Sequence, residues 1–90
     1  MGVGGPLPSR FVLHQNQPNP SAQSTTIRFE LPAECQVTLE VFDLLGRRVR
    51  TLASRRYAPG VHGVEWDQRD DRGIRLRAGV YAYRLTAGAF

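Results

Sequence analysis

The sequence predicts an all-β protein, built as an antiparallel β-sandwich of about seven short strands. Segments in which apolar and polar residues alternate recur about every ten residues, as in half-buried strands. No window of about a dozen residues combines apolar positions at helical spacing with capping residues. The chain has 90 residues, nine glycines and six prolines, so we expect one small, turn-rich domain of immunoglobulin-like or fibronectin III-like type.

The N-terminal region is expected to supply one short strand and an irregular connection. Residues 1–10 have the composition of a flexible linker or of a remnant outside the domain, which spans residues 11–90. Phe11 to Gln15 is a candidate first strand. Between Gln15 and Thr25, two prolines and two asparagines predict a rigid strap across one end of the sandwich, because residues before proline favour extended conformations. Phe42, on the outer face of its sheet, is either covered by this strap or an exposed contact residue.

The middle of the chain predicts a strand followed by a hairpin. Thr25–Leu31 alternates and is ended by a proline, and Gln36–Asp43 repeats the pattern. A tight turn then leads into Arg48–Leu52, with Gly46 at a positive φ. A bulge or strand end near Thr51 is needed, because the two apolar residues there are three apart. The residues expected to face inward are Ile27, Phe29, Leu31, Val37, Leu39, Val41, Val49 and Leu52.

The last part of the chain predicts two further strands with aromatic residues in the core. Val61–Trp66 places Trp66, Val64 and His62 on the same face. The polar stretch Asp67–Gly73 suits a turn with glycine at the positive-φ position. Gly79–Thr86 is the expected final strand. The residues that share its inward face are Tyr81, Tyr83 and Leu85. We interpret these aromatic side chains as core and not as a sugar-binding platform.

Composition argues against several classes of protein. All twelve basic residues are arginines, spread from Arg10 to Arg84, which indicates a solvated basic surface and no nucleic-acid site. No run of about 18 apolar residues predicts a membrane span. The start of the chain lacks the pattern of a secretory signal, so it is either cytosolic or a fragment of a longer exported protein. Cys35 has no second cysteine for a disulfide or a zinc site, and we expect it at a strand start.

Nothing in the sequence predicts an enzyme or a cofactor. His14 and His62 fall on different strands, and no Ser/His/Asp or Cys/His grouping follows from their spacing. The best candidate ligand cluster consists of Asp67, Asp70 and Asp71, because oxygen-rich loops can hold calcium. The alternative for these residues is a turn whose carboxylates accept backbone hydrogen bonds, and we favour it.

A series of short motifs gives the chain a family resemblance. In chain order they are Gln15-Asn16-x-Pro18-Asn19-Pro20, Gly46-Arg47, Trp66-Asp67, Gly73 and Gly79-Val80-Tyr81. Through them, residues 11–90 resemble the C-terminal type A sorting domain of the type IX secretion system. The later motifs are also similar to the immunoglobulin-like domain of the flagellar hook-capping protein.

The resemblance implies a non-catalytic module of a larger bacterial protein that crosses the periplasm to the outer-membrane surface or the extracellular space. Its partners would be the secretion-system proteins and the parent protein on its N-terminal side. An alternative is a structural immunoglobulin-like module that spaces or assembles surface proteins, by strand exchange in one form. A small-ligand or carbohydrate binder is a third, weaker hypothesis.

Sorting domains of this type commonly end with one more strand, a basic residue followed by a short apolar run. The sequence reaches Phe90 without such a segment, so the sandwich is expected to lack a final strand. The edge left open would be an acceptor for another β-strand by augmentation. The residues predicted to form this partner edge are Gly79, Val80, Tyr81, Ala82, Tyr83, Arg84 and Leu85.

Overall fold

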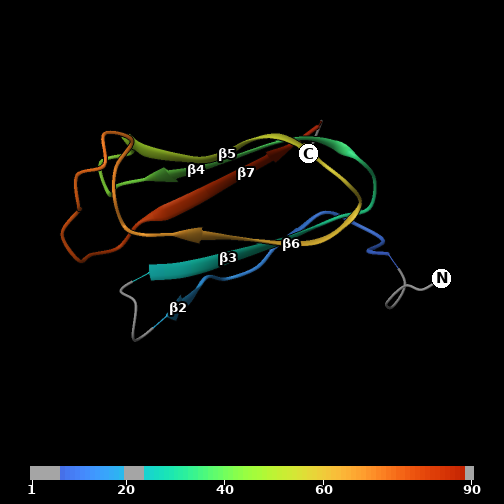
Figure 1. The fold of residues 1–90 in the computed structure, drawn as a ribbon, viewed down its shortest axis with the longest axis horizontal. Helices are drawn as coiled ribbons and strands as arrows, with labels where there is room; N and C mark the ends of the chain where they lie inside the picture. Colours follow the sequence, from blue (N-terminus) through green and yellow to red (C-terminus); the bar gives the residue numbers. More distant parts are fainter. Residues whose placement is uncertain (1–6, 20–23, 89–90) are drawn as a thin grey trace.

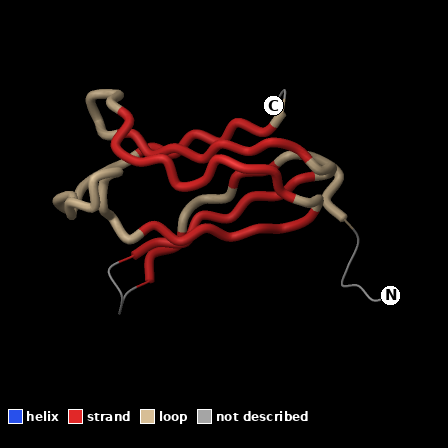
Figure 2. Tube along the Cα trace, turned by 45° about the horizontal axis from the view of Figure 1, so that its top comes forward, coloured by secondary structure: helices blue, strands red, loops and turns tan. Residues whose placement is uncertain are grey.

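The computed structural model describes residues 7–19 and 24–88. Residues 1–6 of the predicted linker, and Pro20 of the predicted strap, lie outside this part of the chain. Among the described residues there is no helix, and strands joined by turns and loops make up the protein (Figure 2). In particular, none of these residues belongs to a helix long and apolar enough to cross a membrane.

Seven strands pack into two antiparallel sheets, as the alternation predicts (Figure 1). The strands are β1 (Val12–Leu13), β2 (Gln17–Asn19), β3 (Ser24–Leu31), β4 (Cys35–Phe42), β5 (Arg48–Tyr57), β6 (Gly60–Trp66) and β7 (Ala82–Ala87). In the first sheet β3 is central, with β6 along one side and β1 and β2 in succession along the other. In the second sheet β4 is central, between β5 and β7.

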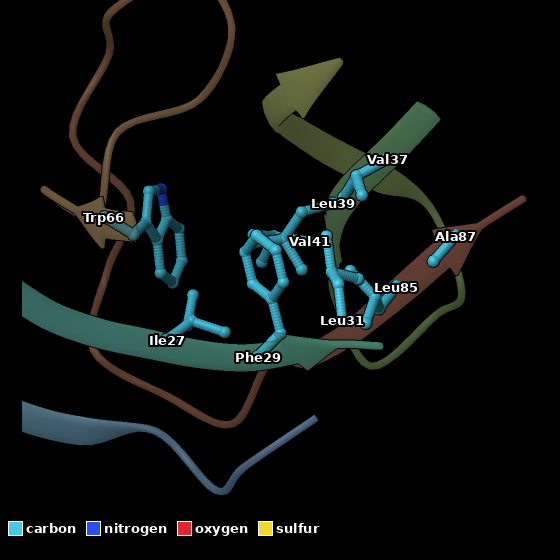
Figure 3. Close-up of a cluster of buried hydrophobic side chains, with 9 residues drawn as sticks. All are labelled: Ile27, Phe29, Leu31, Val37, Leu39, Val41, Trp66, Leu85 and Ala87. Atoms are coloured by element: carbon cyan, nitrogen blue, oxygen red, sulfur yellow. The ribbon is translucent and has the colours of Figure 1, made fainter. Parts of the chain in front are cut away.

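The core lies between the two sheets and is made of the inward faces that the sequence predicts (Figure 3). Its fully or almost fully buried side chains are Ile27, Phe29, Leu31, Val37, Leu39, Val41, Trp66, Leu85 and Ala87. Each of the two central strands, β3 and β4, contributes three of them from alternate positions. Burial of these apolar faces stabilises the sandwich, because the central strands β3 and β4 each hide one side from water.

Two β-bulges resolve the irregular spacing of apolar residues in β5. The register with β4 shifts where Leu39 and Glu40 face Ala53 and Thr51, which leaves Leu52 as the extra residue. A second shift, nearer the turn, leaves Val49 unpaired in the same way. Both extra residues are half-buried and pack against the core. The predicted bulge near Thr51 is therefore confirmed, and a second one occurs close to it.

The prediction of an irregular strap was wrong for Gln17–Asn19. This segment forms β2 and pairs with Ser24–Thr26 of β3, so it lies along a sheet edge and not across the end of the sandwich. A strand at the edge has one neighbour only, which is why it accommodates Pro18. The first strand is also shorter than predicted, since only Val12–Leu13 pairs with β3 there.

The prediction that the strap covers Phe42 also fails. Phe42 belongs to the other sheet, where the guanidinium of Arg84 lies over its ring at 4.8 Å. This stacking leaves the ring half-buried on the outer face of β4. The nearest cover of Phe42 is thus a cation from the neighbouring strand.

The final strand begins three residues later than predicted. β7 starts at Ala82, opposite Phe42, which is the last residue of β4. Gly79, Val80 and Tyr81 lack a partner strand at that point and belong to the preceding loop. The hairpin strand β5, in contrast, continues to Tyr57, five residues beyond the predicted end at Leu52.

Candidate recognition edge

The outer side of β7 is an open strand edge. β7 pairs with β4 from Ala82 opposite Phe42 to Ala87 opposite Val37, without a register shift. In the part of the chain that the structure describes, no strand pairs with its other side. An edge of this kind presents unpaired N–H and C=O groups to solvent, and these are the groups that bind an added strand.

The other sheet edges carry features that discourage strand addition. β5 contains the two bulges. The strand that follows it, β6, belongs to the other sheet and contacts β5. The edge formed by β1 and β2 is interrupted at residues 14–16 and contains Pro18. β6 is regular but includes Gly60 and Gly63. β7 has no proline, glycine or bulge within its bounds, so it is the edge best suited to augmentation.

Side chains on both faces of β7 fix it to the rest of the sheet. On the outer face Arg84 donates to the Oε1 atom of Glu40 from Nε at 3.2 Å and from Nη2 at 3.0 Å. Arg48 lies on the other side of Glu40, with its Nη1 at 3.5 Å from Oε2. The Glu40 side chain is only 10% exposed between these two arginines. The carboxylate therefore joins β5, β4 and β7 across the sheet.

On the inner face Tyr83 and Leu85 pack against the core. The ring of Tyr83 meets Trp66 at 6.2 Å in an edge-on arrangement. Its burial raises the pKa of the phenol above the ordinary value, because the phenolate form would lose hydration. The strand is thus held rigidly while its outer edge stays open.

Of the residues predicted to form the partner edge, Ala82 to Leu85 lie in β7, which continues to Ala87, and Gly79 to Tyr81 lie in the loop before it. The binding of a partner at this edge stays a prediction. Tyr81 lies in the loop, where its hydroxyl donates to the carbonyl of Arg77 at 2.7 Å. Its ring packs edge-on against Trp66 at 5.3 Å. Tyr81 therefore keeps its predicted contact with the core although it is not part of the strand.

The residues of the N-terminal motif secure the first edge. Asn16 donates from Nδ2 to Oγ1 of Thr25 at 2.8 Å, which ties the chain before β2 to the start of β3. Gln15 is exposed in the segment between β1 and β2. Gln17–Asn19 then follows as β2. This motif therefore builds a sheet edge on the side of the first sheet opposite β6.

The Gly46-Arg47 motif forms the turn between β4 and β5. Gly46 has a φ of 80°, as predicted for the turn glycine. Asp43 accepts backbone hydrogen bonds from Leu45 and Arg47, and Arg47 Nε donates to it at 3.0 Å. The backbone donor of Arg47 makes the largest contribution to lowering the pKa of Asp43 below 3.8, with its guanidinium adding to the effect.

The aspartate loop forms the hydrogen-bonded turn favoured by the sequence. The Oδ1 atom of Asp70 accepts from the backbone N–H groups of Arg72 and Ile74, both at 2.9 Å. These bonds, led by that of Ile74, lower the pKa of Asp70 below 3.8. Gly73 has a φ of 85° at the predicted position. The turn thus uses its carboxylate to satisfy backbone donors.

The other two candidate calcium ligands bind elsewhere. Asp71 Oδ1 accepts from the backbone of Thr51 at 2.9 Å, and Asp67 Oδ1 accepts from Arg50 at 3.2 Å. Across residues 7–19 and 24–88, no three histidine, cysteine, aspartate or glutamate side chains gather as a metal site. Asp67 and Asp71 both lie beside the guanidinium of Arg50, whereas Asp70 accepts from the backbone of its own turn. The loop carboxylates are therefore arranged around protein donors.

The two histidines lie on opposite sides of the first sheet. His14, after β1, has Nε2 at 2.5 Å from Oε2 of Glu30. His62, in β6, contacts the carbonyl of Ala58 at 2.7 Å and packs its ring against Tyr57. The structure does not bring these two side chains together, in agreement with their spacing in the sequence.

One surface was missed by the sequence analysis. The exposed side chains of Leu44, Leu45 and Val80 gather at the end of the sandwich, where the β4–β5 turn faces the loop before β7. The signal in the sequence is the pair of leucines inside a tight turn, where polar residues are usual.

Comparison with known families agrees with this architecture. A model of the FlgD Ig-like domain family matches residues 15–89. None of the curated proteins compared with the chain matches it significantly. The matched region contains β2 to β7, so it includes both central strands and most of the sandwich. The chain belongs to the FlgD Ig-like domain family.

Proposed function

We propose that the chain is a non-catalytic recognition module of a larger exported bacterial protein, and that it addresses this protein to the type IX secretion machinery. The observation that carries the proposal is the open edge of β7. Backbone hydrogen bonding along such an edge gives affinity for an extended segment of almost any sequence, while neighbouring side chains select among segments. A module that serves unrelated cargo proteins needs a recognition surface of its own, and β7 supplies one.

The positions of the motif residues support the sorting role. The motifs that resemble type A sorting domains occupy the edge formed by β2, the turn at Gly46 and the loop at Gly73. The rings of Trp66 and Tyr81, from the later motifs, pack edge-on against each other next to the start of β7. The resemblance therefore extends over both sheets and their connections and is not confined to one isolated segment.

A structural module is the second candidate, favoured by the match to the FlgD Ig-like domain family. Such a module would space or assemble surface proteins, and β7 would then pair with a second copy or with a neighbouring subunit. It would work independently of a secretion pathway.

The test is a secretion assay in a bacterium that has a type IX system. A fluorescent reporter is fused in front of residues 1–90, alone and together with any residues that the natural gene encodes after Phe90. The same fusions are expressed in a strain whose type IX translocon has been inactivated. We expect at least one fusion to reach the medium or cell surface in the first strain and to be retained in the second.

Retention of every fusion in both strains, with the domain shown to be folded, would refute the sorting role. Self-association of the folded chain in light scattering would then support the structural module. Export that continues without the type IX translocon would contradict the proposal in another way, because another pathway would be responsible.

A further inference from the structure

The turn between β4 and β5 displays two leucines on a rigid support. Asp43 Oδ1 accepts from the backbone N–H groups of Leu45 at 2.9 Å and Arg47 at 3.0 Å. The N–H of Gly46 donates to the carbonyl of Asp43 at 3.0 Å, closing the turn. The backbone is therefore fixed by Asp43 and Gly46, and the leucine side chains have no part in it. They stand 78% and 77% exposed.

Across from the turn, a third apolar side chain completes a hollow. Val80 is 69% exposed in the loop that precedes β7. Together with Leu44 and Leu45 it lines a hollow of about 280 Å³, which Arg47 and Arg77 border. The turn and this loop lie at the same end of the sandwich, at the left in Figure 1. Apolar side chains gathered around a concavity are typical of binding surfaces, whereas scattered ones are common on any protein.

Arginines outnumber carboxylates around this hollow. A second hollow, of about 530 Å³, shares Asp43, Arg47, Arg77 and Tyr81 with the first and adds Arg48, Arg72, Asp70 and Asp71. The arginines extend into solvent, with the side chain of Arg47 at 73% exposure and that of Arg72 at 79%.

The nearby carboxylates are largely committed to internal contacts. Asp43 is 19% exposed and is bound to its own turn, and Asp70 is 11% exposed and is bound to the loop backbone and Arg72. Asp71, which is half exposed, accepts from the backbone of Thr51. These contacts also occupy Arg47 and Arg72, which pair with Asp43 and Asp70. Among the residues that the structure describes, the charge most available to a ligand is therefore that of Arg77.

Arg77 is the cation best placed to bind a ligand. It borders both hollows, and its guanidinium makes no hydrogen bond or ion pair with any residue that the structure describes. A carboxylate placed in the hollow would reach a cation that need not leave another partner first. Arginine also binds carboxylates in a bidentate manner, which fixes their orientation.

We infer that this end of the sandwich, which we name the leucine-arginine hollow, binds a segment of a partner protein with neighbouring apolar side chains flanked by carboxylates. Leu44, Leu45 and Val80 would contact the apolar side chains, and Arg77 and Arg47 the flanking carboxylates. We favour a peptide segment over a lipid surface because Arg77 borders both hollows, where a side-chain carboxylate can pair with its guanidinium in a bidentate manner. The hollow is bordered by the loop before β7 and not by β7 itself, so its binding does not depend on strand addition at the β7 edge.

The test is a selection of random peptides displayed on phage, with the folded 90-residue chain as bait. We expect the enriched peptides to combine adjacent large apolar residues with aspartate or glutamate. Enriched peptides are then synthesised, and their dissociation constants are measured by fluorescence anisotropy against the wild-type chain and single variants.

Leu45→Ser and Val80→Ser should each weaken binding about tenfold or more, since they remove central apolar contacts. Arg77→Gln should weaken it several-fold, and high salt should reduce this difference. The matched controls are Val61→Ser, an exposed valine on β6, and Arg28→Gln, an exposed arginine on β3. They remove the same groups elsewhere, and binding should change less than about twofold.

Three results would overturn the inference. One is that no peptide is enriched over a bait carrying Leu45→Ser and Val80→Ser. Another is that the enriched peptides lack carboxylates or bind the variants as well as the wild-type chain. The third is leucine-dependent binding of the chain to phosphatidylserine-containing vesicles without peptide binding, which would assign the surface to membranes. Circular dichroism of each variant keeps loss of folding separate from loss of contact.

Discussion

At the scale of single residues, Trp66 joins the two sheets near the loop end of the sandwich. Its indole N–H donates to the carbonyl of Arg69 at 2.9 Å, which anchors the aspartate loop. Its ring packs edge-on against Tyr81 and Tyr83 at the other side of the core. One buried side chain therefore positions both the loop and the start of β7.

We predict that Trp66→Ala lowers the free energy of unfolding by about 3–5 kcal/mol, because it leaves a large cavity and frees the loop carbonyl. Urea denaturation followed by circular dichroism measures the change. Val61→Ala, at an exposed site on β6, is the control and should have little effect. A loss of less than about 1 kcal/mol for Trp66→Ala would show that the tryptophan is not part of the core.

Asp43 and Asp70 make stability depend on pH. Both have a pKa below the ordinary value of 3.8 in the folded chain, mainly because backbone N–H groups donate to the carboxylates. A lowered folded-state pKa contributes stability that is present above the unfolded value and is lost as pH falls through the folded value. We expect their contribution to the unfolding free energy to be constant at neutral pH and to decrease below about pH 4.

In the variants Asp43→Asn and Asp70→Asn, the unfolding free energy should decrease less as the pH falls below about 4. The reason is that asparagine keeps a carbonyl acceptor but does not ionise. The measurement is the urea concentration at the midpoint of unfolding, determined from about pH 6 to about pH 2, a range that includes the ordinary pKa of a carboxylate. The urea midpoint of the double variant should depend less on pH than that of either single variant. If the urea midpoint of the double variant decreased at low pH as steeply as that of the wild-type chain, other groups would control acid unfolding.

At the scale of elements, the hairpin from β4 to β5 depends on one backbone conformation. Gly46 has a positive φ, although a Cβ atom there would meet nothing within 4 Å. Gly46→Ala should therefore cost about 1 kcal/mol through backbone strain alone. Gly63→Ala is the matched control, because its φ is not in the left-handed region and its Cβ would be 3.6 Å from Thr26.

We expect the control to be neutral or slightly stabilising, since alanine restricts the unfolded chain. Thermal unfolding of the two variants side by side measures the difference. Equal destabilisation by both substitutions would show that lost flexibility of glycine, and not the φ of Gly46, is the cause.

The sequence predicts an element well when its alternation of apolar and polar residues is compatible with only one strand register. The alternation of β3 and β4, each buried on one face, leaves a single register, because a slip by one residue would expose the core side. The spacing of Val49 and Leu52 predicts one bulge or a strand end near Thr51, whereas the structure has two bulges in β5. Their positions opposite Leu39–Glu40 and Val41–Phe42 depend on the partner strand, which alternation within β5 does not reveal.

The elements that differ from prediction are those determined by a neighbour. Pro18 argues against a strand in general, but an edge strand needs hydrogen bonds on one side only. Tyr81 continues the alternation of β7, yet β4 ends at Phe42 and gives it nothing to pair with. The sequence therefore places the last strand correctly from Ala82 onward and predicts its start three residues too early.

At the scale of the whole molecule, the two candidate surfaces differ in how far sequence predicts them. An open edge at the last strand is what the resemblance to type A sorting domains implies, because such domains commonly end with one more strand. The leucine-arginine hollow does not, since Leu45 and Val80 are 35 positions apart in the chain. Only the fold brings the turn and the loop to one end.

If β7 recognises a partner by strand addition, it must be a regular edge whose outer side is free to accept a strand. Amide hydrogen exchange of the 90-residue chain, resolved by NMR, tests this requirement most directly. In an antiparallel edge strand alternate N–H groups point away from the neighbouring strand. We predict alternating slow and fast exchange from Ala82 to Ala87, and slow exchange throughout the middle of β4, at every protein concentration. Uniformly slow exchange along β7 would contradict recognition by strand addition, because it would show that the edge is already covered.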